Sequence, residues 1–396
     1  MVDSGEAKGP LDGLRVLELA GIGPVPFAGM LLADMGADVI RLDRVGQGAH
    51  PGDRDDLRYT SINLRGKRSL SVDIREPRGR DVVLRLIETC DVVLEGMRPG
   101  VAERLGLGPE ECLALRPQLV YGRMTGWGQS GPYAQKPGHD INYLALSGVL
   151  EGVGRPDSPP TPPLALVGDF GGGAMFLLFG VMSALHEAKS SGQGQVVDAA
   201  MTEGSALLNT MNYSMGAAGT NSVRRGEHML SGAAPHYDSY ECSDGHWITI
   251  AANEPQFYRE LRDALDLEDD LWEDQHDRAK WVLRKAKLAE IFRTATRDEW
   301  CERLEGRPIC FAPVLDLFEA ADHPQSRARE SFLRREGVLQ PAPAPRLNRT
   351  PGRVTSGAPR IGEHTSSILE ELGVDTDDRY ELERDGVIGV GSSQKI

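Results

Sequence analysis

The first forty residues alternate between two kinds of apolar pattern, and this alternation limits the possible folds more than any other feature. Residues 14–20 (LRVLELA) form a short run rich in β-formers, a glycine- and proline-rich loop follows at 21–26, and residues 27–37 have helical spacing. A second apolar run at 38–43 (DVIRLD) completes the unit. Strand, loop, helix and strand in this order predict parallel strands in an α/β sheet.

The same alternation continues to about residue 126 and then gives way to other patterns. Residues 91–96 and 119–126 resemble further strands, each preceded by a helix-like segment. Around Asp244-Gly245, alternating runs predict a β-hairpin, and the segment after it is helical and rich in charge. Residues 340–359 contain five prolines and predict an extended connector, followed by a short helix that stops at Gly373.

These patterns predict a mixed architecture. We expect a large α/β domain with a parallel sheet over residues 1–200, a smaller α+β domain over 225–330, and an extended return segment with a C-terminal helix over 331–396 that joins the large domain.

Charge and cysteine content limit the function classes. The chain has 44 Lys and Arg against 59 Asp and Glu, a net charge of −15, which argues against nucleic acid as the main partner but leaves room for one small anionic ligand. Its five cysteines are widely spaced without a CxxC motif, so we expect free thiols, no zinc site and a cytoplasmic location. The N-terminal residues lack a signal-peptide pattern, and the apolar stretch 174–185 predicts a buried core helix rather than a membrane span.

The loop at 21–26 (GIGPVP) imitates a dinucleotide fingerprint, with Asp43 about twenty residues further on. However, Pro26 replaces the third glycine, and Pro24 and Pro26 both lack the backbone N–H that a pyrophosphate needs. The sequence therefore argues against an NAD site, and a loop that simply begins a helix is the better interpretation.

Several cations recur after strands in the first hundred or so residues. Taken singly, each is best interpreted as a solvated surface charge. As a set in an acidic chain, they favour a pocket for a ligand that carries several phosphates. These cations are Arg41, Arg44, Arg65, Lys67, Arg68, Arg98 and Arg104.

Three residues are candidates for acid–base chemistry. His139 follows a Pro-Gly turn in PGHDINY (137–143), Asp169 precedes three glycines in GDFGGG (168–173), and Glu254 stands where a helix would begin. The simpler interpretations are a loop histidine and two capping carboxylates. The three glycines exceed what a cap requires and would let a ligand approach the backbone. Nothing in composition or spacing places these residues together.

The motifs just quoted, taken in order along nearly the whole chain, resemble the alpha-methylacyl-CoA racemases of the class III CoA-transferase superfamily. The resemblance implies a Rossmann-like large domain and an isomerase that moves a proton at C2 of 2-methyl-branched acyl-CoA thioesters through an enolate, in lipid and fatty acid metabolism. It implies that His139 and Asp169 are the two acid/base groups and that Glu254 orients His139. Asp140 and Asn142 would support the site. Asp169 would need a raised pKa to act as the opposite acid, which partial burial could supply.

The resemblance also implies a homodimer of interlocked chains, with Glu254 of one chain meeting His139 and Asp169 of the other. CoA would enter as part of the substrate, without a metal or other cofactor and with no membrane partner. Its phosphates would be held by cations drawn from Arg44, Arg65, Lys67, Arg98 and Arg104. Ile22 and the backbone at Gly96 would lie close to the cofactor. The chain departs from the racemase pattern at Ala165, where the family commonly has an asparagine, and this bears on how well the enolate oxygen is supported.

Two other functions compete with this interpretation. In a class III CoA-transferase, Asp169 would instead attack the acyl-CoA as a nucleophile and form a mixed anhydride; His139 and Glu254 argue against this, since a transferase needs neither. A non-catalytic acyl-CoA binder is the third possibility, with Ala165 as its only hint. Residues 209–216 (NTMNYSMG) could contact the acyl chain, although such a Met- and Tyr-rich segment is more often core.

Overall fold

The computed structural model describes residues 9–46, 61–220, 222 and 224–391, and the chain divides into two compact units. The first unit comprises residues 1–147, 164–208 and 328–396, and the second comprises 148–163 and 209–327. Residues 148–163, which we expected within the large domain, thus cluster with the second unit, whereas the C-terminal segment belongs to the first.

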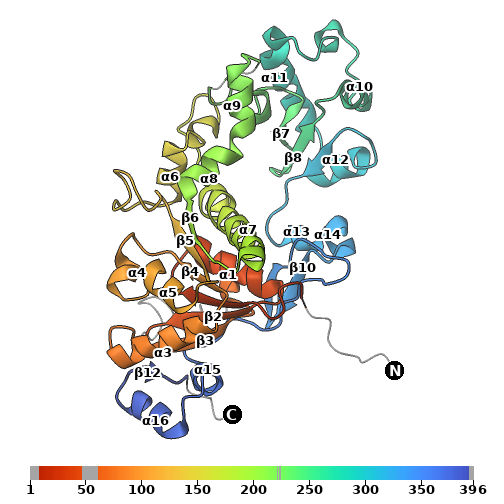
Figure 1. Cartoon of the computed structure of the whole chain (residues 1–396). Helices are drawn as coiled ribbons and strands as arrows, with labels where there is room; N and C mark the ends of the chain where they lie inside the picture. Colours follow the sequence, from red (N-terminus) through yellow and green to blue (C-terminus); the bar gives the residue numbers. More distant parts are fainter. Residues whose placement is uncertain (1–8, 47–60, 221, 223, 392–396) are drawn as a thin grey trace. The chain divides into compact units, whose positions relative to one another are not determined.

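A seven-stranded sheet is the centre of the first unit (Figure 1), with the strand order β12-β3-β2-β1-β4-β5-β6. Its strands are β1 (Arg15–Leu19), β2 (Asp38–Asp43), β3 (Arg68–Val72), β4 (Val92–Glu95), β5 (Val120–Thr125), β6 (Val196–Ala200) and β12 (Ile388–Gly389). Strands β1 to β6 pair in parallel, and only β12 runs antiparallel, beside β3. The order 3-2-1-4-5-6 is that of a doubly wound Rossmann-like sheet. The predicted parallel α/β sheet is confirmed, and β12 is an addition that the sequence patterns did not indicate.

Helices cover both faces of this sheet because successive strand residues point to opposite sides. Leu17 and Leu19 of β1 face a core formed with α3 (Pro77–Glu88), α5 (Pro109–Leu115), α15 (Thr365–Glu371) and α16 (Thr376–Arg384). Val16, between them, faces the opposite core, formed with α1 (Pro24–Asp34) and α7 (Met175–Ser191). Alternate residues of one strand therefore hold two separate helical layers.

The apolar helix of the first unit is longer and less buried than the sequence indicated. A π-helix, η3 (Leu166–Ala174), runs directly into α7. Together they span 26 residues, which is long and apolar enough to cross a membrane by length and composition alone. Leu177 and Val181 are buried against the sheet, whereas Phe179 on another face is 72% exposed. The expectation of a fully buried helix was therefore wrong for one face.

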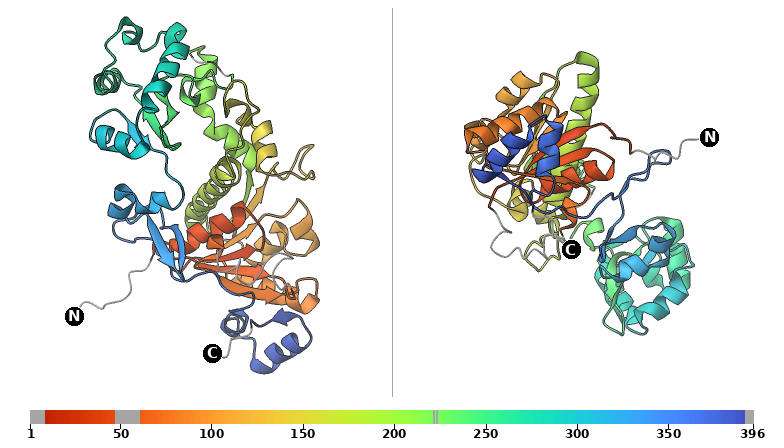
Figure 2. Two further views of the ribbon diagram at one scale, coloured as in Figure 1. Left: turned by 180° about the vertical axis from the view of Figure 1, so that it is seen from behind. Right: turned by 90° about the horizontal axis from the view of Figure 1, so that it is seen from below.

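Three of the remaining helices of the first unit lie between strands of the sheet, and the fourth, α8, follows β6. They are η1 (Ile62–Leu64), α4 (Val101–Arg104), α6 (Asp140–Leu146) and α8 (Met201–Leu208). A hairpin of β10 (Phe332–Arg335) and β11 (Val338–Pro341) begins the return segment, and no regular element follows over 342–360, as predicted for the proline-rich connector. Figure 2 shows how the C-terminal segment (blue) then lies beside α3.

The second unit is built on a three-stranded antiparallel sheet of β7 (Tyr237–Glu241), β8 (Trp247–Ala251) and β9 (Phe311–Pro313). β7 and β8 form the predicted hairpin, and Gly245 has the positive φ of 79° that its turn requires. The helices of this unit are η2 (Leu150–Gly152), α9 (Thr210–Ala217), η4 (Met229–Ser231), α10 (Pro255–Ala264), η5 (Asp270–Trp272), η6 (Arg278–Lys280), α11 (Trp281–Phe292), α12 (Arg297–Leu304), α13 (Glu319–Asp322) and α14 (Pro324–Ala328, whose last residue falls in the first unit).

A buried ion pair links β1 to the residue before β3 in the first unit. The ammonium of Lys67 lies 2.5 Å from Glu18 and also donates to the carbonyl of Pro26 at 2.8 Å. Both side chains are fully buried, and the second oxygen of Glu18 accepts from Arg41. Burial lowers the pKa of Lys67, and the negative charge of Glu18 opposes that effect.

We predict that Lys67→Met will destabilise the fold by about 3 kcal/mol, because removing one member of a buried pair leaves the other charge poorly compensated. The control is Arg75→Ala, which removes an exposed pair with Asp73 that solvent screens, and it should lower the free energy of unfolding much less than Lys67→Met does. Urea unfolding followed by circular dichroism measures both changes. The double variant Glu18→Gln/Lys67→Met should recover part of the loss, and equal effects of the two single variants would contradict the prediction.

Candidate active site

A cavity of about 630 Å³ opens at the carboxyl ends of β1, β4 and β5 in the first unit. In doubly wound sheets, ligands bind at this edge, where the strand order reverses between β1 and β4. The loops after these strands line the cavity with Ile22, Gly96 and Arg98, and later segments add His139 and Asp169. The structure thus brings together two residues that are thirty positions apart in sequence.

Asp169 lies in the first turn of the π-helix η3, whose N-cap is Ala165, so Asp169 is not the capping residue that the simpler interpretation had it to be. π-Helical turns are rare and frequently occur at functional sites. The side chain is half-buried, and a methyl group placed on Gly23 would come within 3.1 Å of its carboxylate. Burial raises the pKa of Asp169, the negative charge of Asp140 raises it further, and His139 opposes both. The raised pKa agrees with what a residue that must also act as an acid requires.

Asp140 connects the two candidate bases. Its carboxylate accepts a hydrogen bond from the backbone N–H of Asp169 at 2.8 Å. Gly168 makes this contact possible, because a Cβ there would lie 2.2 Å from the Asp140 oxygen. Asp140 is also the first residue of α6, directly after His139. One carboxylate therefore joins the start of α6 to η3.

His139 is exposed and occupies the N-cap position of α6. Its backbone N–H donates to Oδ1 of Asn142 at 3.0 Å, and its carbonyl accepts from the Asn142 N–H at 2.8 Å. Both residues line the cavity. The two residues that we expected to support the site, Asp140 and Asn142, thus lie in contact with the backbone of Asp169 and of His139.

Glu254 lies in the second unit, where it is exposed at the N-cap position of α10 before Pro255. Its position agrees with the predicted start of a helix. The role that the resemblance implies for Glu254 requires a second copy of the chain.

The glycines that follow Asp169 serve helix packing, which corrects the expectation that they admit a ligand. A Cβ on Gly172 would meet Ser205 of α8 at 2.5 Å, and a Cβ on Gly204 would meet the carbonyl of Gly172 at 1.9 Å. A Cβ on Gly173 would meet Met201 at 3.1 Å. These close approaches show that η3 and α8 pack backbone to backbone.

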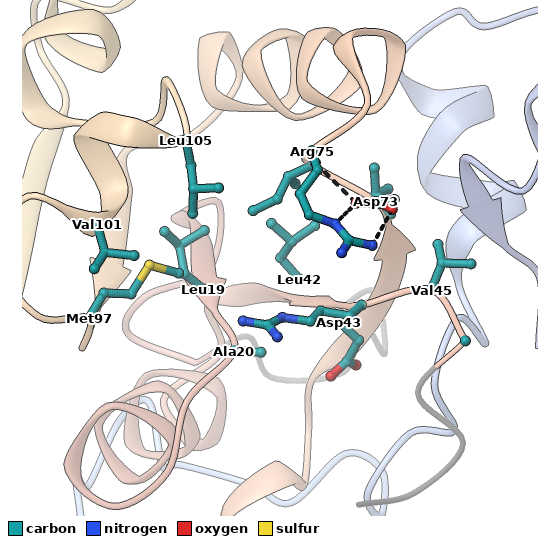
Figure 3. Close-up of a pocket in the computed structure, with 14 residues that line it drawn as sticks. Leu19, Ala20, Leu42, Asp43, Val45, Asp73, Arg75, Met97, Val101 and Leu105 are labelled. Carbon is teal, nitrogen blue, oxygen red and sulfur yellow. Dashed lines mark hydrogen bonds and ion pairs between the residues drawn. The ribbon is translucent and has the colours of Figure 1, made fainter.

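A second cavity, of about 390 Å³, lies at the carboxyl ends of β1, β2 and β3 (Figure 3). Arg44 is exposed and lines it together with Arg75, which is paired with Asp73. Leu19, Leu42 and Leu105 form its apolar part. Met97 lines both cavities, so the two adjoin along the loop after β4.

Two of the predicted phosphate ligands, Arg65 and Lys67, are already used inside the fold. Arg65 is 3% exposed; its guanidinium binds both oxygens of Asp34 at 2.6 and 3.0 Å and donates to Gln340. Lys67 is 1% exposed and paired with Glu18. Both predictions are therefore corrected, because a buried, paired cation is not available to a phosphate at the surface.

The other predicted CoA contacts differ in position. Arg44 and Arg98 are exposed at the cavities, and Ile22 is 81% exposed beside His139 and Asp169. Gly96 lies close to Val25, because a Cβ placed on Gly96 would be 3.0 Å from the Val25 side chain. Arg104 is exposed, but within the part of the chain that the structure describes it lines neither cavity.

Among the cavity residues that the sequence analysis missed are Trp127, Lys136 and Tyr143. Trp127 and Lys136 lie between β5 and α6, and Tyr143 lies one turn into α6. Their place in the sequence after β5 could have indicated them, because the segment that follows β5 in a parallel sheet leads to the same edge as the loops after β1 and β4. The departure at Ala165 lies just before η3, where its carbonyl accepts from the Phe170 N–H at 3.1 Å.

The comparisons with known proteins agree with this geometry. Residues 11–365 match the family described as CoA-transferase family III. The chain belongs to this family. It is 42% identical over 380 residues to the alpha-methylacyl-CoA racemase of Mus musculus, covering 96% of this chain and 97% of that protein. A CAIB/BAIF family protein from Brucella suis has the same fold, with a TM-score of 0.81 and 28% identity over 92% of this chain and 100% of that chain.

Transferases of the family are similar to this chain as well. Succinyl-CoA–D-citramalate CoA-transferase of Chloroflexus aurantiacus is 34% identical over 403 residues, covering 96% of this chain and 98% of that protein. The identity to the mouse racemase is higher over a similar share of the chain. The predicted family is therefore confirmed, and similarity favours its racemase branch.

We predict that Asp140→Asn will lower the pKa of Asp169. Asparagine keeps an oxygen for the Asp169 N–H but removes the negative charge that raises the pKa of Asp169. Titration of aspartate carboxyls by ¹³C NMR measures this, with Asp169→Asn to identify the resonance and Asp81→Asn, on the surface of α3, as the control. An unchanged or higher pKa of Asp169 would show that the Asp140 charge does not act on it.

Proposed function

We propose that the protein is a 2-methylacyl-CoA racemase that moves the C2 proton between His139 and Asp169. The observation that carries this proposal is the meeting of these two side chains at one cavity, where Asp140 links the backbone segments that bear them. The family membership and the similarity to a racemase supply the substrate class.

Racemisation next to a thioester requires two groups on opposite faces of C2. One base removes the C2 proton, and the electron pair moves into the thioester carbonyl to give an enolate. The conjugate acid of the other base then returns a proton to the opposite face and restores the carbonyl. In one direction His139 is the base and Asp169 the acid, and the roles exchange in the other direction. The raised pKa of Asp169 favours its protonated form and so supports this second role.

The two adjoining cavities suit a CoA thioester. We place the thioester in the cavity with His139 and Asp169 and the nucleotide end in the cavity with Arg44, so that the chain of CoA passes Met97 and Arg98. Guanidinium groups bind phosphates well because their donors match two oxygens at once. In this proposal CoA arrives as part of the substrate, and the proton transfers require no metal or redox cofactor.

We further propose that the active enzyme is a homodimer in which Glu254 of the partner subunit orients His139. Large apolar side chains that are exposed within a single chain support a second copy as their cover. They include Met175 and Phe179 of α7 in the first unit, and Met211 and Tyr213 of α9 in the second. A cytoplasmic location stays a prediction.

We predict that Arg44→Ala and Arg98→Ala will each weaken CoA binding about 10-fold, the loss expected for one charge-assisted hydrogen bond to a phosphate. Arg85→Ala, which removes an exposed cation on α3 that donates to the Leu372 carbonyl, is the matched control and should leave binding unchanged. Isothermal titration calorimetry with free CoA measures the affinities. Equal losses in all three variants would indicate a general charge effect and contradict the proposed sites.

The test of the reaction is proton exchange in deuterated buffer. The protein is incubated with one enantiomer of a 2-methylacyl-CoA, without an acceptor acid, and deuterium at C2 and the enantiomer ratio are followed together. We expect exchange with loss of stereochemical purity, and about 10²–10⁴-fold slower racemisation in His139→Ala and Asp169→Ala. His246→Ala, in the hairpin turn, is the control histidine.

Two results would overturn the proposal. Full racemisation by either site variant would exclude the two-base scheme. If the protein instead shows no exchange but transfers CoA to an added carboxylic acid, Asp169 is a nucleophile and the protein is a transferase.

A further inference from the structure

Tyr143 holds the peptide group that leads into His139. It lies four residues after His139 on α6 and is only 8% exposed. Its hydroxyl donates to the carbonyl of Gly138, and Oδ1 of Asn142 accepts from the N–H of His139. This carbonyl and this N–H belong to the same peptide group. Two side chains of α6 therefore fix both polar ends of the peptide that carries His139.

The ring of Tyr143 is itself tightly held. It packs edge-on against Trp127, with ring centroids 4.8 Å apart. A Cβ on Gly126 would lie 1.9 Å from the ring, and one on Gly138 would lie 2.8 Å from it. The ring thus fills the space between the residue after β5 and the loop before His139. The Gly126 carbonyl is fixed in turn by the N–H and hydroxyl of Thr202.

Charged residues of the candidate site act on the phenol of Tyr143. Burial raises the pKa of its phenol, and the charges of Asp169 and Asp140 raise it further, whereas Arg98 lowers it. The phenol therefore stays protonated at neutral pH and remains a hydrogen-bond donor. Tyr143 also lines the cavity that holds both candidate bases.

We propose that Tyr143 is a positioning residue, whose hydroxyl aims His139 at C2 by fixing the peptide group between Gly138 and His139. The inference rests on the proposed racemase function. Loss of the hydroxyl should disturb His139 but not Asp169, because Asp169 is held separately by η3 and by Asp140. Proton removal by His139 should therefore slow, and proton removal by Asp169 should not.

The test is Tyr143→Phe, which keeps the ring against Trp127 and removes only the hydroxyl. In a two-base racemase each base takes the proton from one enantiomer, so deuterium exchange of the two enantiomers of a 2-methylacyl-CoA is measured separately. We expect exchange of one enantiomer to slow about 10-fold, the loss of one hydrogen bond, while the other changes less than about twofold. The slowed enantiomer should be the one that His139→Ala affects most, and the KM should stay within about twofold.

Tyr133→Phe is the matched control, because Tyr133 also packs on Trp127, with ring centroids 5.1 Å apart, but is 40% exposed. It should leave both exchange rates unchanged. Thermal unfolding shows whether each variant is folded. If Tyr143→Phe does not fold, Asn142→Ala replaces it as the test, because it removes the hydrogen bond to the N–H of the same peptide group. It should slow exchange of the same enantiomer and leave the other unchanged.

The outcomes separate this inference from the function on which it rests. Equal slowing of both enantiomers, or no slowing, in Tyr143→Phe would overturn the positioning role while the racemase stands. The absence of exchange in the unmodified protein, with CoA transfer to an added acid, would overturn both.

Discussion

The buried pair of Lys67 and Glu18 is the interaction on which the site depends, because it fixes the start of α1. The Lys67 ammonium joins the strand residue Glu18 to the carbonyl of Pro26 in the first turn of α1. Gly29 is required above this pair, since a Cβ there would lie 1.9 Å from a Glu18 oxygen. A charge pair that is costly to bury thus sets how closely α1 approaches the sheet. Because α1 is fixed, Gly23, which precedes it, lies beside the carboxylate of Asp169 without a side chain between them.

A short series of contacts connects α1 to both candidate bases. Phe27 of α1 packs on Phe170, with ring centroids 4.6 Å apart, and this contact holds η3 beside the loop after β1. Asp140 then ties Asp169 to α6. Because Asp140 both accepts from the Asp169 N–H and raises the pKa of Asp169, one residue links the geometry of the site to its electrostatics. Pre-organisation of this kind is what proton transfer at carbon requires.

The sequence predicted those features that depend on local pattern or on the family, and it missed those that depend on distant pairing. The strands β1, β2, β4 and β5 and the β7–β8 hairpin follow from apolar periodicity and turn residues. Arg65 and Lys67 looked like ligands because their partners, Asp34 and Glu18, lie 31 and 49 residues away. A count of charges cannot show which of them are paired inside a fold.

The glycines after Asp169 show the same limit in another form. A run of three glycines is compatible with a ligand loop and with close helix packing, and only the position of α8 decides between them. Strand β12 was missed because two residues carry too little periodicity to predict a strand, and its pairing with β3 depends on the C-terminal segment crossing the sheet edge. The positions of His139 and Asp169 at one cavity, by contrast, agree with what the family resemblance implied.

The structure also explains how a sheet with a dinucleotide-binding strand order can serve a different ligand. In a dinucleotide site the N-terminus of the first helix offers backbone N–H groups to the pyrophosphate. Here Pro24 and Pro26 occupy the first turn of α1 and supply no such donors. In the proposed mode of CoA binding, side chains provide the positive charge, and the exposed Arg44 and Arg98 lie on the loops after β2 and β4. In this proposed mode, arginine side chains thus replace the helix terminus as the anion site, and the edge at β1 and β4 holds Asp169 and His139.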